Sequence, residues 1–146
     1  MKLKTLLLAL LLVCGSSIFA QVTIDVFING TKAGQYTIKK DATTGGISYK
    51  KKDYKNLDKL SIQISGKLKE KGNVRTVEVS DNDDVVIYTA PETEGIKNQF
   101  ILSDKAVIKR LSKGKSVKLN LVSAPANEKM AGAIRKTYIG TLSTGK

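Results

Sequence analysis

Hydrophobic and polar residues alternate at the start of the segment from residue 22 to residue 38, VTIDVFINGTKAGQYTI. Val22, Ile24 and Val26 share one parity, which is typical of a strand with one buried face. Asn29-Gly30 follows, and this dipeptide favours the positive φ angles of a tight hairpin turn. The pattern therefore predicts a β-hairpin over residues 22–38.

The register of this hairpin is constrained by its hydrophobic positions. A plain two-residue turn at Asn29-Gly30 would set Ile24 opposite Gln35 and place Tyr36 on the wrong face of the sheet. Pairing Ile24 with Tyr36 requires one extra residue. Either a three-residue loop or a bulge at Ala33-Gly34 supplies it, and both arrangements remain open.

A second hairpin is predicted further along the chain. One parity is shared by Leu60, Ile62, Ile64 and Leu68 and the other by Val77 and Val79, with a polar loop at residues 69–72 between the two segments. Pairing Ile64 with Val77 aligns the two hydrophobic faces across that loop. We therefore expect these two segments to be antiparallel neighbours.

A third strand is expected at residues 85–89. Val85 and Ile87 keep the parity of Val77 across an odd-length turn, so the three strands should form a meander. Ala90-Pro91 ends it, because proline has no N–H to donate within a central strand.

The turn before this strand, Asp81-Asn82-Asp83-Asp84, suggests a calcium site, since Ca²⁺ takes carboxylate and amide oxygens as ligands. The spacing of an EF-hand loop mostly fails here. With Asp81 at position one, Val85 and Val86 occupy positions five and six, where an oxygen ligand and glycine are required. A hydrated turn built on Asx hydrogen bonds is the favoured interpretation.

A short helix is predicted from about residue 104 to residue 113, directly after a buried strand at residues 100–102. Ser103 can cap it and Asp104 lies in its first turn, while Gly114 stands at its expected end. Six cations lie between Lys105 and Lys118, and on a helix several of them would interact with its C-terminal dipole rather than form a binding patch.

Two more strands are predicted near the end of the chain. Residues 116–122 alternate clearly, and residues 134–142 form a last strand weakened by Gly140. A loop at residues 124–127 and one helical turn at residues 128–133 should connect them. Residues 143–146 are expected to fray.

Residues 1–20 have the organisation of a secretory signal peptide. Lys2 and Lys4 precede a short apolar run, and Ala20 ends a stretch suited to cleavage. Removing this segment leaves residues 21–146, which we expect to form one β-rich domain. No later segment approaches the roughly 18 consecutive apolar residues of a transmembrane helix.

A bacterial lipoprotein signal is the competing interpretation of this leader, because Cys14 also follows an apolar run. The residue before that cysteine is Val13, whereas lipoprotein signals carry a small residue there. We therefore expect cleavage after Ala20 and an exported protein, periplasmic or secreted, rather than lipid attachment at Cys14. The mature chain would then contain no cysteine and no disulfide.

The 146-residue chain is strongly basic, with 25 Lys and Arg against 13 Asp and Glu. Removing Lys2 and Lys4 leaves 23 basic residues and a net charge of +10. Such a charge favours encounters with acidic polysaccharides or anionic lipid, and export argues against nucleic acid. The plainer interpretation, that lysines discourage edge-to-edge strand pairing, remains open. The candidate polyanion-binding residues are Lys50, Lys51, Lys52, Tyr54, Lys109, Arg110, Lys113, Lys115 and Lys118.

The mature chain offers little catalytic chemistry. It contains no His, Trp or Cys, which removes the commonest general base and every thiol nucleophile. No nucleophile elbow or phosphate-binding glycine loop occurs, and Ser103-Asp104-Lys105 lacks the spacing of an S-x-x-K motif. We expect no enzyme, no metal and no cofactor.

These patterns predict an all-β, mainly antiparallel fold: a β-sandwich of about seven or eight strands with one short helix. A closed β-barrel is the alternative. The expected function is that of an exported, non-catalytic module with a structural or binding role, whose envelope or extracellular partner the sequence does not identify. The alternatives are a polyanion binder with a basic surface and a barrel that carries a small apolar ligand.

Overall fold

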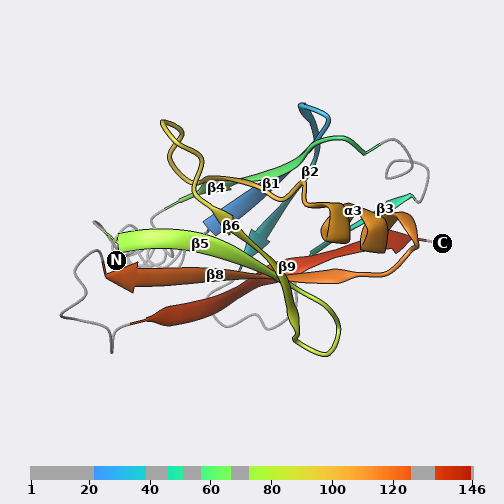
Figure 1. Ribbon diagram of the computed structural model, residues 1–146. Helices are drawn as coiled ribbons and strands as arrows, with labels where there is room; N and C mark the ends of the chain where they lie inside the picture. The colour runs from blue at the N-terminus through green and yellow to red at the C-terminus, as the bar shows by residue number, and fades with distance from the viewer. Residues whose placement is uncertain (1–21, 39–45, 51–56, 67–72, 126–133, 146) are drawn as a thin grey trace, which may run out of the picture.

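The computed structural model describes residues 22–38, 46–50, 57–66, 73–125 and 134–145 (Figure 1). Within these residues, nine strands and one helix are present. They are β1 (Val22–Ile28), β2 (Thr31–Ile38), β3 (Gly46–Lys50), β4 (Leu60–Ser65), β5 (Asn73–Ser80), β6 (Val86–Pro91), β7 (Gln99–Ile101), α3 (Lys105–Ser112), β8 (Val117–Pro125) and β9 (Arg135–Gly145).

The strands form two facing sheets with hydrophobic side chains between them. The order is β2-β1-β4-β7 in the four-stranded sheet and β3-β9-β8-β5-β6 in the five-stranded sheet. Neighbours are antiparallel except β3 and β9, which are parallel. The predicted, mainly antiparallel β-sandwich with one short helix is therefore confirmed.

The closed-barrel alternative is wrong for the part of the chain that the structure describes. Each sheet keeps two edge strands, β2 and β7 in one and β3 and β6 in the other. Closing a barrel would require these edges to pair, with all strands in a single sheet.

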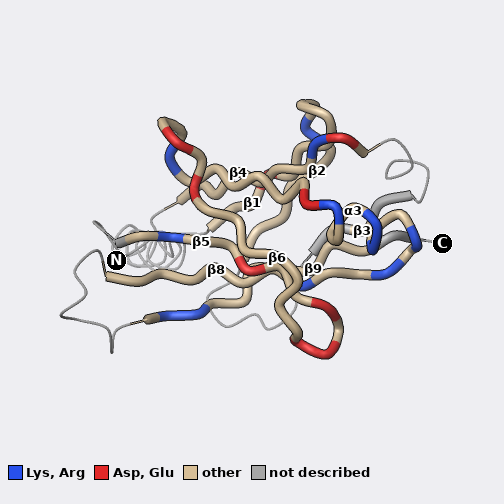
Figure 2. Tube along the Cα trace, in the orientation of Figure 1, with Lys and Arg blue, Asp and Glu red and all other residues tan. Residues whose placement is uncertain are grey.

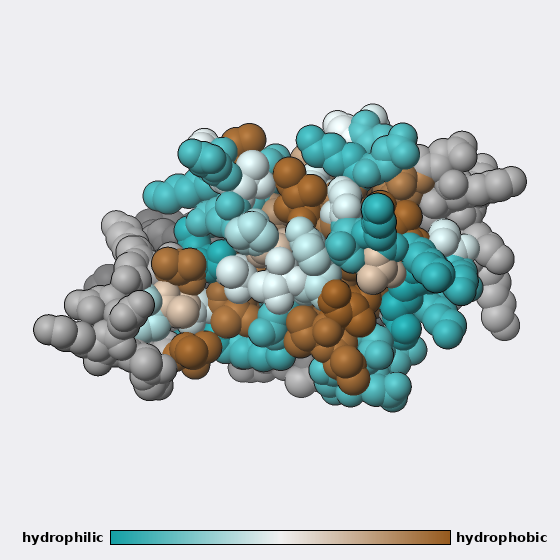
Figure 3. Space-filling view, in the orientation of Figure 1, coloured by the Kyte–Doolittle hydropathy of each residue, from teal (hydrophilic) through white to brown (hydrophobic). Residues whose placement is uncertain are grey.

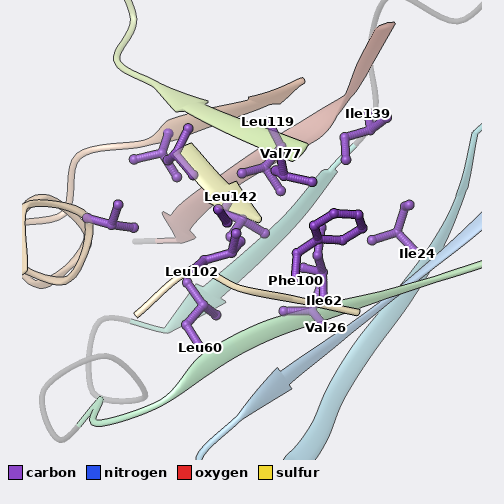
Figure 4. Packing of buried hydrophobic residues seen from close by; sticks show 14 of the residues in the cluster. Ile24, Val26, Leu60, Ile62, Val77, Phe100, Leu102, Leu119, Ile139 and Leu142 are labelled. Carbon is purple, nitrogen blue, oxygen red and sulfur yellow. The ribbon is translucent and has the colours of Figure 1, made fainter. Parts of the chain in front are cut away.

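The core lies between the two sheets and draws on both (Figure 4). Phe100 of β7 is completely buried and lies beside Ile62 of β4, its cross-strand partner, with Ile24 of β1 on the same sheet nearby. A buried aliphatic or aromatic side chain of this kind contributes about 1.5–3 kcal/mol relative to an exposed one. The other fully buried large side chains are Leu60, Ile64, Leu102, Leu111, Leu119, Leu142, Val26 and Val77.

The β1–β2 hairpin has the predicted register, and the extra residue that this register requires is Ala33. Ile24 lies opposite Tyr36, and a two-residue turn at Asn29-Gly30 has φ angles of 50° and 82°. The register then shifts so that Val26 lies opposite Gly34 and Ala33 has no direct partner. Of the two open arrangements, the tight turn followed by a bulge is correct.

The predicted hairpin of residues 60–68 with residues 73–79 is wrong. β4 pairs with β1 and β7, while β5 pairs with β6 and β8 in the opposite sheet. Both strands do bury the predicted faces, but those faces meet across the core and not within one sheet. Alternation specifies which side of a strand is buried and does not specify its neighbour.

The predicted β5–β6 pairing is confirmed, although its parity is wrong and no meander with β4 exists. A bulge between Val79 and Ser80 sets Val79 opposite Tyr88 and Val77 opposite Ala90. Ala90 is fully buried, whereas Val85 is 57% exposed. The bulge therefore exchanges the buried and exposed faces of β6 relative to those predicted from the length of the turn alone.

Helix α3 occupies most of the predicted range of residues 104–113. Its N-cap is Asp104, whose carboxylate accepts a hydrogen bond from the Ala106 N–H at 2.8 Å. The expected cap, Ser103, instead bonds the backbone N–H of Leu60 at 2.7 Å. Gly114, with φ of 77°, follows the helix as predicted.

The last two strands are longer than predicted. β8 continues to Pro125, through residues expected to form a loop, because Asn73 and Val74 of β5 extend the pairing. β9 continues to Gly145, through a tail expected to fray, because β3 lies beside it and pairs Lys50 with Gly145. A partner strand thus stabilises segments whose own composition is weakly β-forming.

Other predictions lie outside the described residues. They concern the leader at residues 1–20 and the helical turn at residues 128–133. Among the described helices, none has the length and apolar character needed to cross a membrane.

Candidate functional site

Helix α3 presents a basic face at one end of the sandwich (Figure 2). Val107 and Leu111 are buried on its inner side and anchor it to the core. Lys105 and Lys109 are exposed on its outer side, and Lys113, the C-cap residue, is exposed as well. We call Lys105, Lys109 and Lys113 the lysine row.

The lysine row follows the helical repeat. Its members are spaced four residues apart, so their Cα atoms are separated by about 6 Å along the helix axis. Within the described residues, none of the three ammonium groups forms an ion pair. Their charges are therefore available to an external anion.

One acid lies at the beginning of the row. Asp104 is half-buried, and its carboxylate is occupied by the Ala106 N–H. No Asp or Glu occurs between Lys105 and Lys118. The outer face of the helix is consequently cationic along its whole length.

Two of the predicted binding cations serve internal contacts. The Arg110 Nε donates to the Ser116 carbonyl at 2.8 Å and ties the helix to the turn before β8. The Lys118 Nζ lies 2.9 Å from the Asp84 carboxylate and 3.1 Å from the Asn82 carbonyl. Both side chains hold loops together, and we assign neither to ligand binding.

The acidic turn at residues 81–84 lies beside the start of β8. The Asp81 Oδ1 accepts hydrogen bonds from the backbone N–H groups of Asp83 at 2.9 Å and Val85 at 3.0 Å. These are the Asx bonds that the sequence predicts. The Ser116 hydroxyl lies 2.7 Å from the Asn82 Oδ1, so the turn is fastened to the segment after α3.

The acidic turn has no arrangement suited to a metal ion. Among the described residues, no three side chains of Asp, Glu, Cys or His come together as a potential ligand set. Asp84 is directed to Lys118, and Asp81 to the backbone of its own turn. These carboxylates therefore act as local structural groups.

Val85 and Val86 form an exposed apolar patch next to the acidic turn, at 57% and 43% exposure. Figure 3 shows that hydrophobic (brown) side chains gather on this face of the molecule, bordered by hydrophilic (teal) surface.

The nine predicted binding residues fall into three groups. Lys51, Lys52 and Tyr54 lie outside the described residues, and Lys50 is placed in β3 by its backbone alone. The structure brings the remaining five together on α3, the turn that follows it and the start of β8. Of these, the exposed ones are Lys109, Lys113 and Lys115.

The sequence prediction omitted Lys105 from the site. Its signal was present, because a helix over residues 104–113 places residues 105 and 109 on one face. Lys105 could have been predicted as a binding residue because it shares a face of the predicted helix with Lys109, which was already a candidate.

A second charged cluster lies between β5 and the segment after β6. The Arg75 Nη2 lies 3.3 Å from the Glu92 Oε1, which also accepts a hydrogen bond from the Asn98 N–H at 2.5 Å. The Arg75 side chain is only 11% exposed. This ion pair stabilises the segment between β6 and β7, where the chain passes from one sheet to the other.

Comparison of the chain with protein-family models, with curated proteins and with solved structures found no match.

Proposed function

We propose that this protein is an exported, non-catalytic binding module that attaches to anionic material of the bacterial envelope or the extracellular space. The leader-like segment at residues 1–20 supports the export part of the proposal. The observation that carries the binding part is the exposed lysine row on α3, whose charges form no ion pair within the described residues.

An exposed row of lysines suits binding by charge. Lysine presents a mobile ammonium group on a long stem, which meets phosphate, sulfate or carboxylate without a fixed geometry. Association through such contacts is favoured by release of the counterions of the polyanion, and it weakens as salt rises. The net charge of +10 that remains once Lys2 and Lys4 are removed with the leader would further speed the encounter.

A purely structural module is the second candidate. The same lysines would then keep an exposed helix and the neighbouring strand edges from associating with other chains. The apolar-carrier hypothesis has less support, because it depended on a closed barrel and the described strands form two open sheets.

Salt-dependent binding separates the two candidates. The protein recovered after export is titrated against dextran sulfate and against vesicles of phosphatidylglycerol, with phosphatidylcholine vesicles as control. If three or four lysines contact the polymer, affinity should fall about 30-fold between roughly 50 and 200 mM salt. Binding that is absent at low salt, or unchanged across this range, would contradict the proposed function.

A further inference from the structure

We propose that the anionic partner is a linear polymer that lies along α3, with successive charged groups meeting Lys105, Lys109 and Lys113. This inference rests on the proposed function and specifies the shape of its ligand. A chain-like polyanion with a regular anionic repeat is required, whether its charges are phosphate, sulfate or carboxylate.

The helix geometry supplies the first argument. The three lysines rise along the axis in steps of about 6 Å, and no other side-chain charge interrupts them on the exposed face. Val107 and Leu111, both fully buried, hold the helix in place beneath them. The helix therefore fixes the backbone positions of the three lysines along one line, while each ammonium group moves on its own stem.

The surroundings of the row supply the second argument. The acidic turn at residues 81–84 is held against the start of β8 by Lys118 and Ser116, and Asp83 is exposed on it. A broad anionic surface that covers α3 would also approach this turn and be repelled. A narrow chain can follow the lysine row and avoid the turn, so we favour a linear polymer over a bilayer.

The far end of the row extends the same surface. Lys115 is exposed just beyond Lys113, before the chain enters β8. The backbone N–H of Lys113 bonds the Arg110 carbonyl at 3.2 Å, and that of Gly114 bonds the Leu111 carbonyl at 2.9 Å, so the helix end is well defined. A polymer that continues past the end of α3 therefore meets a fourth exposed cation.

The test compares two triple variants with the same change in net charge. One is K105Q/K109Q/K113Q, which removes the lysine row. The control is K32Q/K97Q/K136Q, whose residues lie on β2, before β7 and on β9. Lys32 and Lys136 form partly exposed ion pairs with Asp25 and Glu78, so each variant's thermal unfolding is measured alongside its binding.

Long-chain inorganic polyphosphate serves as the linear probe, and phosphatidylglycerol vesicles serve as the planar one. We expect the row variant to bind polyphosphate at least about tenfold more weakly than the control variant at low salt. Its plot of log affinity against log salt should be shallower by about 2, because three contacts are lost. A K105R/K109R/K113R variant keeps the three positive charges and should retain binding. This result would show that the glutamine variant binds weakly because it has lost charge and not because it has lost its fold.

The outcomes distinguish this inference from the proposed function. Equal losses in both triple variants would overturn the lysine row as the binding line while leaving anion binding intact. Tighter binding of the unaltered protein to vesicles than to polyphosphate would overturn the linear ligand. Failure of the unaltered protein to bind any anionic probe would remove the proposed function and this inference together.

Discussion

The ring of Tyr36 occupies the space that a side chain at position 140 would need. A Cβ atom built on Gly140 would lie 2.7 Å from the Tyr36 Cζ, and the Tyr36 hydroxyl donates to the neighbouring Ile139 carbonyl at 2.7 Å. Tyr36 belongs to β2 and Gly140 to β9, so this contact joins the two sheets along one side of the sandwich.

Replacing Gly140 with alanine should destabilise the protein by about 3 kcal/mol. The new methyl group collides with the Tyr36 ring, and φ at this position is 136°, a value that residues other than glycine rarely adopt. Urea unfolding measures the loss. Gly95→Ala is the control, because φ is 75° there but nothing lies near the added methyl group, and it should cost only about 1 kcal/mol.

The steric part of this cost depends on Tyr36. In a Tyr36→Ala background, Gly140→Ala should cost at least about 1 kcal/mol less than in the unaltered protein, because the ring is gone. Additive effects of the two substitutions would show that backbone strain alone accounts for the loss.

Glu92→Ala should destabilise the protein by about 2 kcal/mol. It leaves the largely buried Arg75 guanidinium without its ion pair and the Asn98 N–H without an acceptor. Glu92→Gln keeps an acceptor oxygen for Asn98 and should cost about half as much. Asp84→Asn is the comparison for an exposed pair and should change stability by less than about 0.5 kcal/mol. Equal effects of the alanine and glutamine variants would contradict the role of the Asn98 bond.

Asp104→Ala should destabilise α3 by about 1 kcal/mol, because the Ala106 N–H loses its cap. Asp104→Ser should retain most of the stability, since its hydroxyl can accept the same hydrogen bond. Chemical unfolding followed by circular dichroism checks both. Ser103→Ala tests the sequence-based cap, and its effect should instead reflect the lost bonds to Leu60.

Asp83→Asn should strengthen binding to a polyanion about twofold at roughly 50 mM salt, because one repulsive charge near the basic end is removed. The difference should shrink at about 200 mM salt, where exposed charges are screened more strongly. Glu94→Gln, which lies in the segment between β6 and β7, makes the same charge change and should have a smaller effect. A larger effect of Glu94→Gln would place the binding surface elsewhere.

The intact mass of the protein recovered from outside the cytoplasm tests the proposed export and processing. Cleavage after Ala20 gives a chain that begins at Gln21, contains no cysteine and is unchanged by a thiol-alkylating reagent. Retention of Cys14 with added acyl mass would instead establish a lipoprotein. Intact-mass spectrometry distinguishes the two products directly.

The β1–β2 hairpin shows what local sequence determines. Its register was predictable because Asn29-Gly30 specifies the turn and the pairing of Ile24 with Tyr36 is required by hydrophobicity. The predicted N-cap of α3, Ser103, was wrong by one residue, because both Ser103 and Asp104 suit that position. The hydrogen bond between Ser103 and the backbone of Leu60, which is a tertiary contact, leaves Asp104 as the cap.

The partners of β4 and β5 show what local sequence leaves open. Ile64 and Val77 are both fully or almost fully buried as predicted, yet they lie in opposite sheets. A short polar loop is compatible with either a hairpin or a crossing between sheets, and only the full set of strands selects one. At the candidate site, the basic residues were predictable, but the internal use of Arg110 and Lys118 depended on loops brought together by the fold.

The parallel pairing of β3 with β9 has a consequence for the order of folding. Gly46 lies opposite Thr141, and among the described strands β3 is an edge strand whose one sheet neighbour is β9. The β1–β2 hairpin can form from contiguous residues, but β3 has no sheet partner until the chain beyond Thr141 is available. Contacts of such high sequence separation slow folding. If the protein is exported as an unfolded chain, this late closure would lengthen the period in which it remains competent for translocation.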